Sequence, residues 1–507
     1  MALSPLLVIL TGAALSYLIY TRITLYRARQ RFKKEHNCQP CTSVFHKDPI
    51  LGLDAMRVMA YNSKHHITLQ ENKRRFEKYG NTFHNRIINT PLIATCEPEN
   101  IKTMLSLRFK DYSFEHRQAG LGPLLGHGIF NAQGERWANS RQLLRPNFAR
   151  DQVADLDAFE RHFKLMMKHI PRDGTTVDLQ DLFFMLTIDS ATEFLFNHST
   201  NTLRMAGNDD AHNEDVIFSK AFNFAQFDIT KRMRLGPLDR FRSNEEGERA
   251  IKICHEYIDK FVEDALRFRK ELDGEKKAGG EAKDEKYYFI QEVAKQTTDK
   301  KRIREELINI LLAGRDTTAS LLSNMFFELA RRPEIWAKLR EEVESLGGER
   351  PSYEQLRGLK YLKWCLNESL RTHPVVPNNS RLAACDTVLP RGGGPDGQAP
   401  LFVPKGTIMG YSVYTMHRRK DLYGPDADKY DPERWATLRP SWEYLPFNGG
   451  PRICLGQQYA LTEASYVTVR MLQEFKAMES RDAEPWIEGL TLTLCSKNGV
   501  KVGLTPA

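Results

Sequence analysis

The sequence predicts an α+β protein that is mainly helical, with small β-sheets at its periphery. Between about residues 70 and 380, apolar residues recur at spacings of three and four, for example over 156–167, 222–227 and 253–268. Short strand-like runs occur near its start, at 82–89 and 92–95, and after its end, at 387–389, 401–403, 407–410 and 490–504. A long helix-like segment spans 299–332 and is nearly all apolar from 307 to 327. These observations together indicate a helical body built around one central helix.

The central segment is expected to form a single helix that ends before Pro333, because proline lacks an N–H group and clashes with the preceding turn. From 307 to 327 it is nearly all apolar, which predicts burial. The motif Ala-Gly-Arg-Asp-Thr-Thr at 313–318 interrupts this run with two charges. Its glycine weakens the helix, and Thr317 and Thr318 can bond back to preceding carbonyls and bend it. We therefore expect a groove beside this motif.

Composition limits the class of protein and its compartment. The 507 residues are 41% hydrophobic and 27% charged, as in an ordinary globular protein. Eight scattered cysteines are too few for a disulfide framework, which favours a reducing compartment where a free thiolate can bind a metal. The net charge of +8 suits an acidic protein partner or a membrane surface, and no basic-aromatic pattern points to nucleic acid.

The most informative short segment is Phe-Asn-Gly-Gly-Pro-Arg-Ile-Cys-Leu-Gly at 447–456. Its cysteine, Cys454, lies in a turn of glycines and proline, two residues after Arg452 and just before a helix-like run at 457–475. A helix N-terminus, free backbone N–H groups and a nearby cation all favour a thiolate. The small residues would let a flat cofactor approach the backbone closely. The alternative is a buried structural cysteine beside a surface turn.

This segment resembles the heme-binding loop of the cytochrome P-450 family, in which the cysteine thiolate is the axial ligand of iron. The resemblance implies the cytochrome P-450 fold, with a long central helix over heme b and small peripheral sheets. It also implies that Cys454 binds the iron and that Phe447, Gly450, Arg452 and Gly456 contact the cofactor.

The motif at 313–318 resembles the oxygen-activating motif of the family's central helix. By that resemblance Thr317 holds dioxygen and the water that protonates it, and Asp316 relays protons from solvent. The alternative is that the threonines bond only to backbone carbonyls while Asp316 pairs with a neighbouring cation.

Four further residues resemble the propionate-binding set of the family. Trp137 and Arg141 are four residues apart, so they share one helical face, and Arg381 and Arg452 occupy the other expected positions. Arginine suits a carboxylate because its planar fork donates two hydrogen bonds at once.

Glu368 and Arg371, with Arg434, resemble the buried Glu–Arg–Arg triad of the family. Removing one member of such a network strands a buried charge, at about 3–5 kcal/mol. We assign this triad to folding and heme retention rather than to chemistry.

The N-terminus predicts a membrane anchor. Residues 2–20 carry no charge, and as a helix they would reach about 28 Å, close to the thickness of the endoplasmic reticulum membrane. Six basic residues follow before Glu35, which places the rest of the chain in the cytoplasm, whereas a cleaved signal carries its charges first. We expect a single-pass anchor over 1–21, a basic linker containing proline over 22–60, and a heme-thiolate catalytic domain over 61–507.

The segments 51–54, 128–150 and 454–466 resemble the yeast and fungal branch that hydroxylates the terminal carbon of alkanes and fatty acids, family fifty-two. The stretch 375–380 departs from the pattern of that branch through Asn378 and Asn379, at a place that typically borders the substrate. The alternative is therefore a secondary-metabolite enzyme that tailors a polyketide or lipid-like intermediate.

We expect a monomeric, membrane-anchored monooxygenase that acts on an aliphatic C–H bond and consumes dioxygen. Electrons would come from NADPH through a separate cytochrome P-450 reductase, because the chain has no G-x-G-x-x-G fingerprint after a strand. That reductase would dock on the basic face near the cysteine loop, with His-Arg-Arg-Lys at 417–420 as the candidate patch. The alternatives of another class are a heme-thiolate isomerase or dehydratase that acts on a hydroperoxide, which Asp316 and Thr317 disfavour, and a non-enzymatic heme-binding or scaffold protein.

Overall fold

The computed structural model describes residues 5–48, 52–87, 90–148, 156–207, 212–277 and 288–507. Two units are distinguished by their internal contacts. The sheet unit comprises Met1–Val58, Asn72–Ser113 and Ser380–Ser412. The helical unit comprises Met59–Glu71, Phe114–Asn379 and Val413–Ala507.

A six-stranded sheet organises the sheet unit, in the order β1-β2-β3-β9-β6-β4. The strands are β1 (Thr42–Ser43), β2 (Thr82–Ile87), β3 (Thr90–Thr95), β4 (Tyr112–Ser113), β6 (Asn378–Ala383) and β9 (Ile408–Ser412). A separate antiparallel pair is formed by β7 (Thr387–Gly393) and β8 (Ala399–Val403). The helical segments are α1 (Pro5–Glu35), α2 (Leu53–Lys64), α3 (Thr68–Tyr79), α4 (Pro98–Lys102), η1 (Thr103–Leu107) and η2 (Phe109–Asp111), of which α2 and α3 pass into the helical unit.

The helix α1 continues past residue 21, where we expected the anchor to give way to a linker, and ends only at Glu35. Its basic half is held within the sheet unit, because Arg29 Nη2 lies 2.9 Å from Asp386 Oδ1. Residues 1–4 of the expected anchor lie outside the described part of the chain. Among the residues that the structure describes, no helix combines the length and apolar character needed to cross a membrane.

In the described part of the chain, the helical unit holds most of the helices and two small groups of strands. Its α-helices are α5 (Gln118–Leu125), α6 (Gly134–Leu144), α8 (Leu156–Met167), α9 (Leu179–Phe196), α10 (Glu214–Leu235), α11 (Glu245–Lys277), α12 (Phe289–Gln296), α13 (Lys300–Leu329), α14 (Pro333–Glu344), α15 (Tyr353–Gly358), α16 (Lys360–Thr372), α17 (Val413–Met416), α18 (Lys420–Tyr423) and α19 (Gln457–Glu474). Short helical turns are η3 (Glu115–Arg117), η4 (Arg145–Phe148), η5 (Gly236–Phe241), η6 (Pro432–Ala436) and η7 (Gly450–Arg452). The strands are β5 (Val177–Asp178), β10 (Phe475–Ser480), β11 (Glu488–Leu490), β12 (Leu494–Ser496) and β13 (Lys501–Pro506), with β10-β13-β5 forming one sheet and β11-β12 a hairpin.

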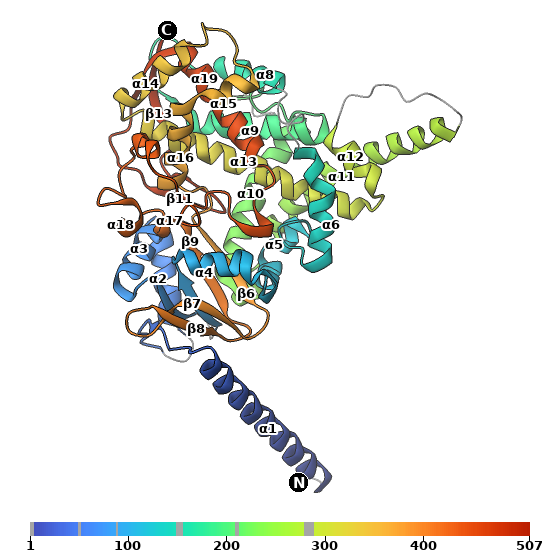
Figure 1. Ribbon diagram of the computed structural model, residues 1–507. Helices are drawn as coiled ribbons and strands as arrows, with labels where there is room; N and C mark the ends of the chain where they lie inside the picture. The colour runs from blue at the N-terminus through green and yellow to red at the C-terminus, as the bar shows by residue number, and fades with distance from the viewer. Residues whose placement is uncertain (1–4, 49–51, 88–89, 149–155, 208–211, 278–287) are drawn as a thin grey trace. The chain divides into compact units, whose positions relative to one another are not determined.

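The helix α13 is the central helix that the sequence predicts. It begins where the Asp299 side chain accepts a hydrogen bond from Arg302 N at 3.1 Å, and it ends before Pro333. Both hydrophobic cores of the helical unit draw residues from it, Leu307–Leu312 in one and Ala319–Leu329 in the other. It packs against α9 and α19 (Figure 1), so it links the helix that follows the cysteine loop to the rest of the unit.

The predicted fold class, α+β and mainly helical, is confirmed, and so are the predicted strand positions within a few residues. One local expectation is wrong. From its composition, charged and containing glycine with no apolar face, the stretch 270–286 is expected to be an exposed loop, but α11 continues to Lys277, and 278–286 lie outside the described residues. Residues 270–277 have no apolar face of their own. They continue α11 because they follow directly on its amphipathic part.

Candidate functional site

Two positions of the cysteine loop require glycine, one because of its backbone conformation and the other because of close packing. Gly450 has φ +68°, in the left-handed region that favours glycine. A β-carbon on Gly449 would lie 2.8 Å from Cζ3 of Trp442, so this position is closed by packing. The turn is fastened by Cys454 N, which donates to Phe447 O at 3.0 Å. The loop therefore holds Cys454 immediately before α19, as its sequence predicts.

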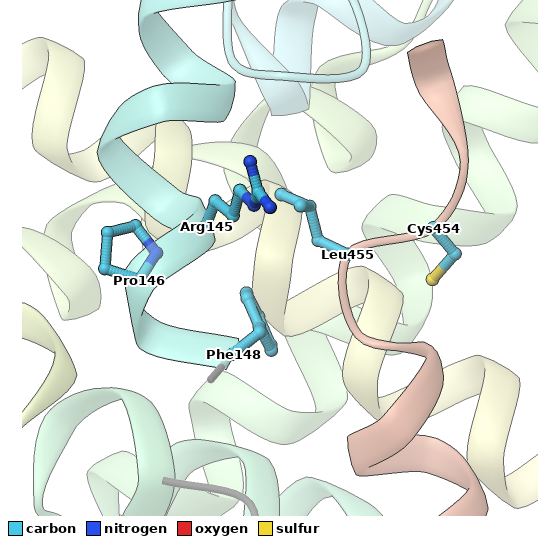
Figure 2. Close-up of a pocket in the computed structure, with 5 residues that line it drawn as sticks. All are labelled: Arg145, Pro146, Phe148, Cys454 and Leu455. Carbon is cyan, nitrogen blue, oxygen red and sulfur yellow. The ribbon is translucent and has the colours of Figure 1, made fainter. Parts of the chain in front are cut away.

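The surroundings of Cys454 act on its thiol in opposite directions. Burial raises the pKa of the Cys454 thiol above its usual value, while the Gly456 N–H group and the Arg141 guanidinium lower that pKa. Although protein surrounds it, the Cys454 side chain retains accessible surface, and Ile453 beside it is 39% exposed. A pocket of about 440 Å³ reaches the loop (Figure 2), lined by Arg145, Pro146, Phe148, Cys454 and Leu455. Cys454 therefore has open space beside it, as a metal ligand would require.

A second open face lies on α13. Between Glu305 and Leu329 every residue is buried except Ala313, Gly314 and Thr317, which share one side of the helix. A β-carbon on Gly314 would meet only Ala191 Cβ, at 3.6 Å. Thr317 Oγ1 donates to Ala313 O at 2.6 Å. These three residues keep some accessible surface on a helix that is otherwise buried, and the groove expected beside the motif stays a prediction. The Thr317 hydroxyl meanwhile makes the backbone contact that was the alternative to an oxygen-binding role.

Asp316 is buried next to Thr317 and is paired within its own helix. Arg315 Nη1 donates to Asp316 Oδ1 at 2.6 Å, and the Arg315 guanidinium stacks 4.5 Å from the ring centroid of Phe184 on α9. Burial raises the pKa of Asp316, and Arg315 followed by Gln226 of α10 lowers it again. The pairing with a neighbouring cation, weighed from the sequence, is what the structure contains.

Three of the four expected propionate-binding residues meet near the cysteine loop. Arg141 Nη1 donates to Ile453 O at 2.9 Å. The Arg452 guanidinium lies 4.5 Å from the ring centroid of Trp137, and its Nη2 donates to Ala132 O at 2.7 Å. Arg381 belongs to the sheet unit, where it is 2% exposed and its Nη1 donates to Ser380 O at 2.8 Å. The role of Arg381 in the same site stays a prediction.

The sequence reasoning missed a polar network that fastens α13 to the segment before α6. Ile129 N donates to Glu306 Oε2 at 3.0 Å, and Phe130 N donates to Asn309 Oδ1 at 3.1 Å. A β-carbon on Gly128 would overlap the Asn309 side chain, so only glycine fits there. The sequence did contain a signal for this network, because Glu306 and Asn309, an acid and an amide, lie three residues apart within a mostly apolar helix.

Comparison with known proteins decides the family. The sequence model of the family described as Cytochrome P450 matches residues 56–502. The chain belongs to the cytochrome P450 family. It is 52% identical over 494 residues to cytochrome P450 monooxygenase himC of Aspergillus japonicus, covering 96% of this chain and 88% of that protein. It is 41% identical over 514 residues to cytochrome P450 52A13 of Debaryomyces hansenii, covering 98% and 97%.

A third relative, cytochrome P450 52A1 of Candida tropicalis, is 46% identical over 439 residues, which cover 82% of this chain and 79% of that protein. The chain is therefore a heme-thiolate monooxygenase that uses dioxygen and takes electrons from a redox partner. Membership of this family and these relatives decide against the isomerase and the non-enzymatic alternatives.

The residues of this P450 fit a heme. The donor set offers one thiolate ligand, Cys454, with accessible surface at its sulfur-bearing side chain. Arg141 and Arg452 bring two cations to the same loop, where they suit propionate carboxylates. The accessible face of Ala313, Gly314 and Thr317 supplies space in a helix that is otherwise buried.

The predicted structural triad of the P450 comes together as a buried network. Glu368 and Arg371 are fully buried, and Arg371 donates through Nη2 and Nε to the two Glu368 oxygens at 2.7 and 2.8 Å. Arg434 Nε lies 3.5 Å from Glu368 Oε1. The sequence reasoning missed two further members: Trp435 Nε1 donates to Glu368 Oε2 at 3.0 Å, and Asp426 Oδ2 accepts from Arg434 at 3.0 Å.

The candidate docking patch at 417–420 is wrong for three of its four residues. His417 is fully buried and its Nε2 accepts from Leu445 N at 2.9 Å. Arg418 is 7% exposed and stacks 3.9 Å from the Tyr414 ring. Arg419 is paired with Asp421. Three consecutive basic residues suggested a surface, but a short helical turn directs them into the protein and leaves only Lys420 exposed.

Proposed function

We propose that this P450 hydroxylates the terminal region of a long-chain alkane or fatty acid. The observation that carries the proposal is the similarity to cytochrome P450 52A13 over nearly the full length of both chains, together with the segments that resemble family fifty-two. The open face of α13 supports it, because Ala313 and Gly314 present only small groups to whatever lies beside them. A slender aliphatic chain suits such a surface.

The heme, when bound, supplies the activation of dioxygen and the insertion of one oxygen atom into the C–H bond. Cys454 would hold the iron through its thiolate; burial raises the pKa of this thiol, and the Gly456 N–H group and Arg141 lower it. Thr317 Oγ1 lies on the accessible face of α13. When its hydroxyl gives up the hydrogen bond to Ala313 O, it becomes a proton donor for dioxygen or for a water molecule. Asp316 passes protons to that hydroxyl, and Arg315 holds its carboxylate in place until it does so.

A second candidate substrate class is favoured by a specific observation. The identity to himC, 52%, exceeds the identity to cytochrome P450 52A13, 41%. At the position where the sequence departs from family fifty-two, Asn379 Oδ1 accepts a hydrogen bond from Arg117 Nη2, so a polar pair stands in a stretch that typically borders the substrate. A polyketide or lipid-like metabolite with a polar group would suit that pair.

Product identification separates the two classes. Membranes that contain the enzyme and a reductase are supplied with NADPH and with alkanes or fatty acids, and the products are identified by mass spectrometry. Terminal alcohols or their acids support the proposal. Absence of any hydroxylated product, while the reduced carbon-monoxide complex shows the red-shifted thiolate band, contradicts it and favours the metabolite class. Cys454→Ala is the negative control, since it is expected to lose both the band and the activity.

We also propose that α1 anchors the enzyme to the endoplasmic reticulum membrane, with the catalytic part facing the cytoplasm. Support comes from the exposed apolar side chains of α1, among them Leu7, Ile9, Leu15 and Ile19, and from the basic residues that follow them. The test is alkaline carbonate extraction of the full chain and of a chain that begins at residue 36. Release of the full chain by carbonate would contradict the anchor.

The redox partner proposed here is NADPH–cytochrome P450 reductase, with the P450 acting as a monomer. Arg145 replaces the incorrect patch as the support for docking, because it is exposed and lines the pocket that reaches the cysteine loop (Figure 2). Electron delivery from reductase and NADPH, measured as reduction under carbon monoxide, tests the identity of this partner.

A further inference from the structure

Glu463 is a buried carboxyl group at the meeting point of three helices. It lies in the second turn of α19, the helix that begins just after Cys454, and it is 1% exposed. Its Oε1 accepts a hydrogen bond from Ser190 Oγ of α9 at 2.5 Å. The hydroxyl of Thr318 on α13 also lies close enough to lower the pKa of Glu463. Glu463 thus stands between the helix of the iron ligand and the residue next to Thr317.

Among the residues that the structure describes, no cation is paired with this carboxyl group. On α9, the Asp189 carboxylate is bound by Thr200 and Leu203, and on α13 Asp316 is bound by Arg315. On α19 itself, Arg470 is paired with Glu160. Burial raises the pKa of Glu463 to about 8, even after the lowering by Ser190 and Thr318. At neutral pH the group therefore carries its proton and is a hydrogen-bond donor as well as an acceptor.

The proton of neutral Glu463 can be donated to the Thr318 hydroxyl. Glu463 Oε2 and Thr318 Oγ1 are both buried, and no described residue gives either atom a hydrogen bond of good geometry. Leaving such atoms unsatisfied is unfavourable, whereas a bond from Oε2–H to Thr318 Oγ1 satisfies both. An ionised Glu463 would lose this donor and would place an uncompensated charge in the core.

We propose that neutral Glu463 is a positioning residue that fixes the helix of the iron ligand against the helix of the oxygen-activating threonine. Its Oε1 accepts from Ser190 and its Oε2–H donates to Thr318, so the turn of α13 that carries Thr317 keeps a fixed distance from α19. Catalytic groups lose efficiency when they move by about half an ångström. This link therefore determines which fraction of the NADPH electrons is used to form product and which fraction is released as hydrogen peroxide.

The experiment compares Glu463→Gln with Glu463→Leu in the heme-loaded enzyme. Glutamine keeps an acceptor and a donor at neutral charge, whereas leucine keeps the volume and removes the link. The fraction of NADPH electrons released as hydrogen peroxide is measured between pH 6 and 9, beside the reduced carbon-monoxide spectrum. We expect wild type to release more peroxide as pH rises through about 8, Glu463→Gln to stay low throughout, and Glu463→Leu to release about fivefold more at every pH.

A stability measurement gives a readout that does not depend on turnover. The folded state keeps the Glu463 proton up to about pH 8, whereas an unfolded glutamate releases it near pH 4.3, roughly its unperturbed pKa. Wild type therefore loses stability as pH rises between these values, and glutamine does not. The melting temperature of Glu463→Gln relative to wild type should rise from pH 5 to 8 and then level off. A parallel pH course for the two proteins overturns the proposal, as does wild-type coupling in Glu463→Leu. If the leucine variant does not fold, the comparison of glutamine with wild type still decides.

Discussion

Arg315 Nη1 lies 2.6 Å from Asp316 Oδ1, although the two residues are neighbours on one helix. Adjacent residues on a helix point about 100° apart, so this contact requires the arginine to fold back along α13. Phe184 stabilises that conformation, because its ring centroid lies 4.5 Å from the Arg315 guanidinium. The cation that holds the expected proton relay is therefore supplied by the same helix.

Removing this cation should shift the pH dependence of turnover. Burial raises the pKa of Asp316 and Arg315 lowers it, so Arg315→Gln should raise that pKa further. In this variant Asp316 is ionised, and so able to accept a proton from solvent, only at higher pH. The acid limb of the profile of turnover rate against pH therefore moves to higher pH. Product formation against pH, in light and heavy water, measures this. Lys301→Gln removes a cation whose side chain is 70% exposed on the same helix, and it should leave the limb in place. Identical acid limbs in wild type and Arg315→Gln would show that the pair has no part in proton delivery.

Thr317→Ala should separate electron consumption from product formation. The variant removes the hydroxyl on the accessible face of α13 but leaves Cys454 untouched. We expect NADPH oxidation to continue, most of the electrons to appear as hydrogen peroxide, and the reduced carbon-monoxide band to persist. Ser323→Ala is the matched control, since Ser323 Oγ donates to Ala319 O at 2.7 Å in the same way but at a fully buried position. Thr317→Ala that couples as well as Ser323→Ala would remove the oxygen-activating role.

Glu368→Gln should destabilise the fold by about 3–5 kcal/mol, because it leaves the fully buried Arg371 without its counter-charge. Urea unfolding, followed through the heme absorption and the far-ultraviolet circular dichroism, measures both the stability and heme retention. Glu433→Gln serves as the control: its side chain is 43% exposed, and it pairs with Lys338 at the surface. Equal midpoints for the two variants would mean that the triad contributes no more than a surface ion pair.

The parts of this site that the sequence predicts are those with local causes. Gly450 at φ +68° and the start of α19 beside Cys454 follow from the loop's own composition, and Asp299 and Pro333 bound the central helix by capping and by steric exclusion. The meeting of Glu368, Arg371 and Arg434 was predictable only through resemblance, because no local rule brings residues more than 60 positions apart into contact.

What the sequence does not predict depends on contacts between distant segments. Glu463 has no local mark of burial at the junction with Ser190, more than 270 residues away. His417 and Arg418 have the composition of a surface patch, yet Leu445 and Tyr414 hold them inside. Burial of a polar side chain is set by the partners that a fold happens to bring to it, and those partners are invisible in a window of neighbouring residues.

Arg145→Glu should weaken electron delivery without harming the heme site. Arg145 is exposed at the end of α6 and lines the pocket that Cys454 and Leu455 share, so it offers a positive charge to an acidic partner close to the iron ligand. Reversing the charge should raise the reductase concentration needed for half-maximal turnover severalfold at low salt, and high salt should abolish the difference. Turnover driven by added hydrogen peroxide requires no reductase and should remain at the wild-type rate. Lys252→Glu, at a side chain 72% exposed on α11, controls for the change of net charge. A loss in the peroxide-driven reaction would place Arg145 in the heme site instead of the docking surface, and equal reductase dependence in the two variants would exclude it from docking.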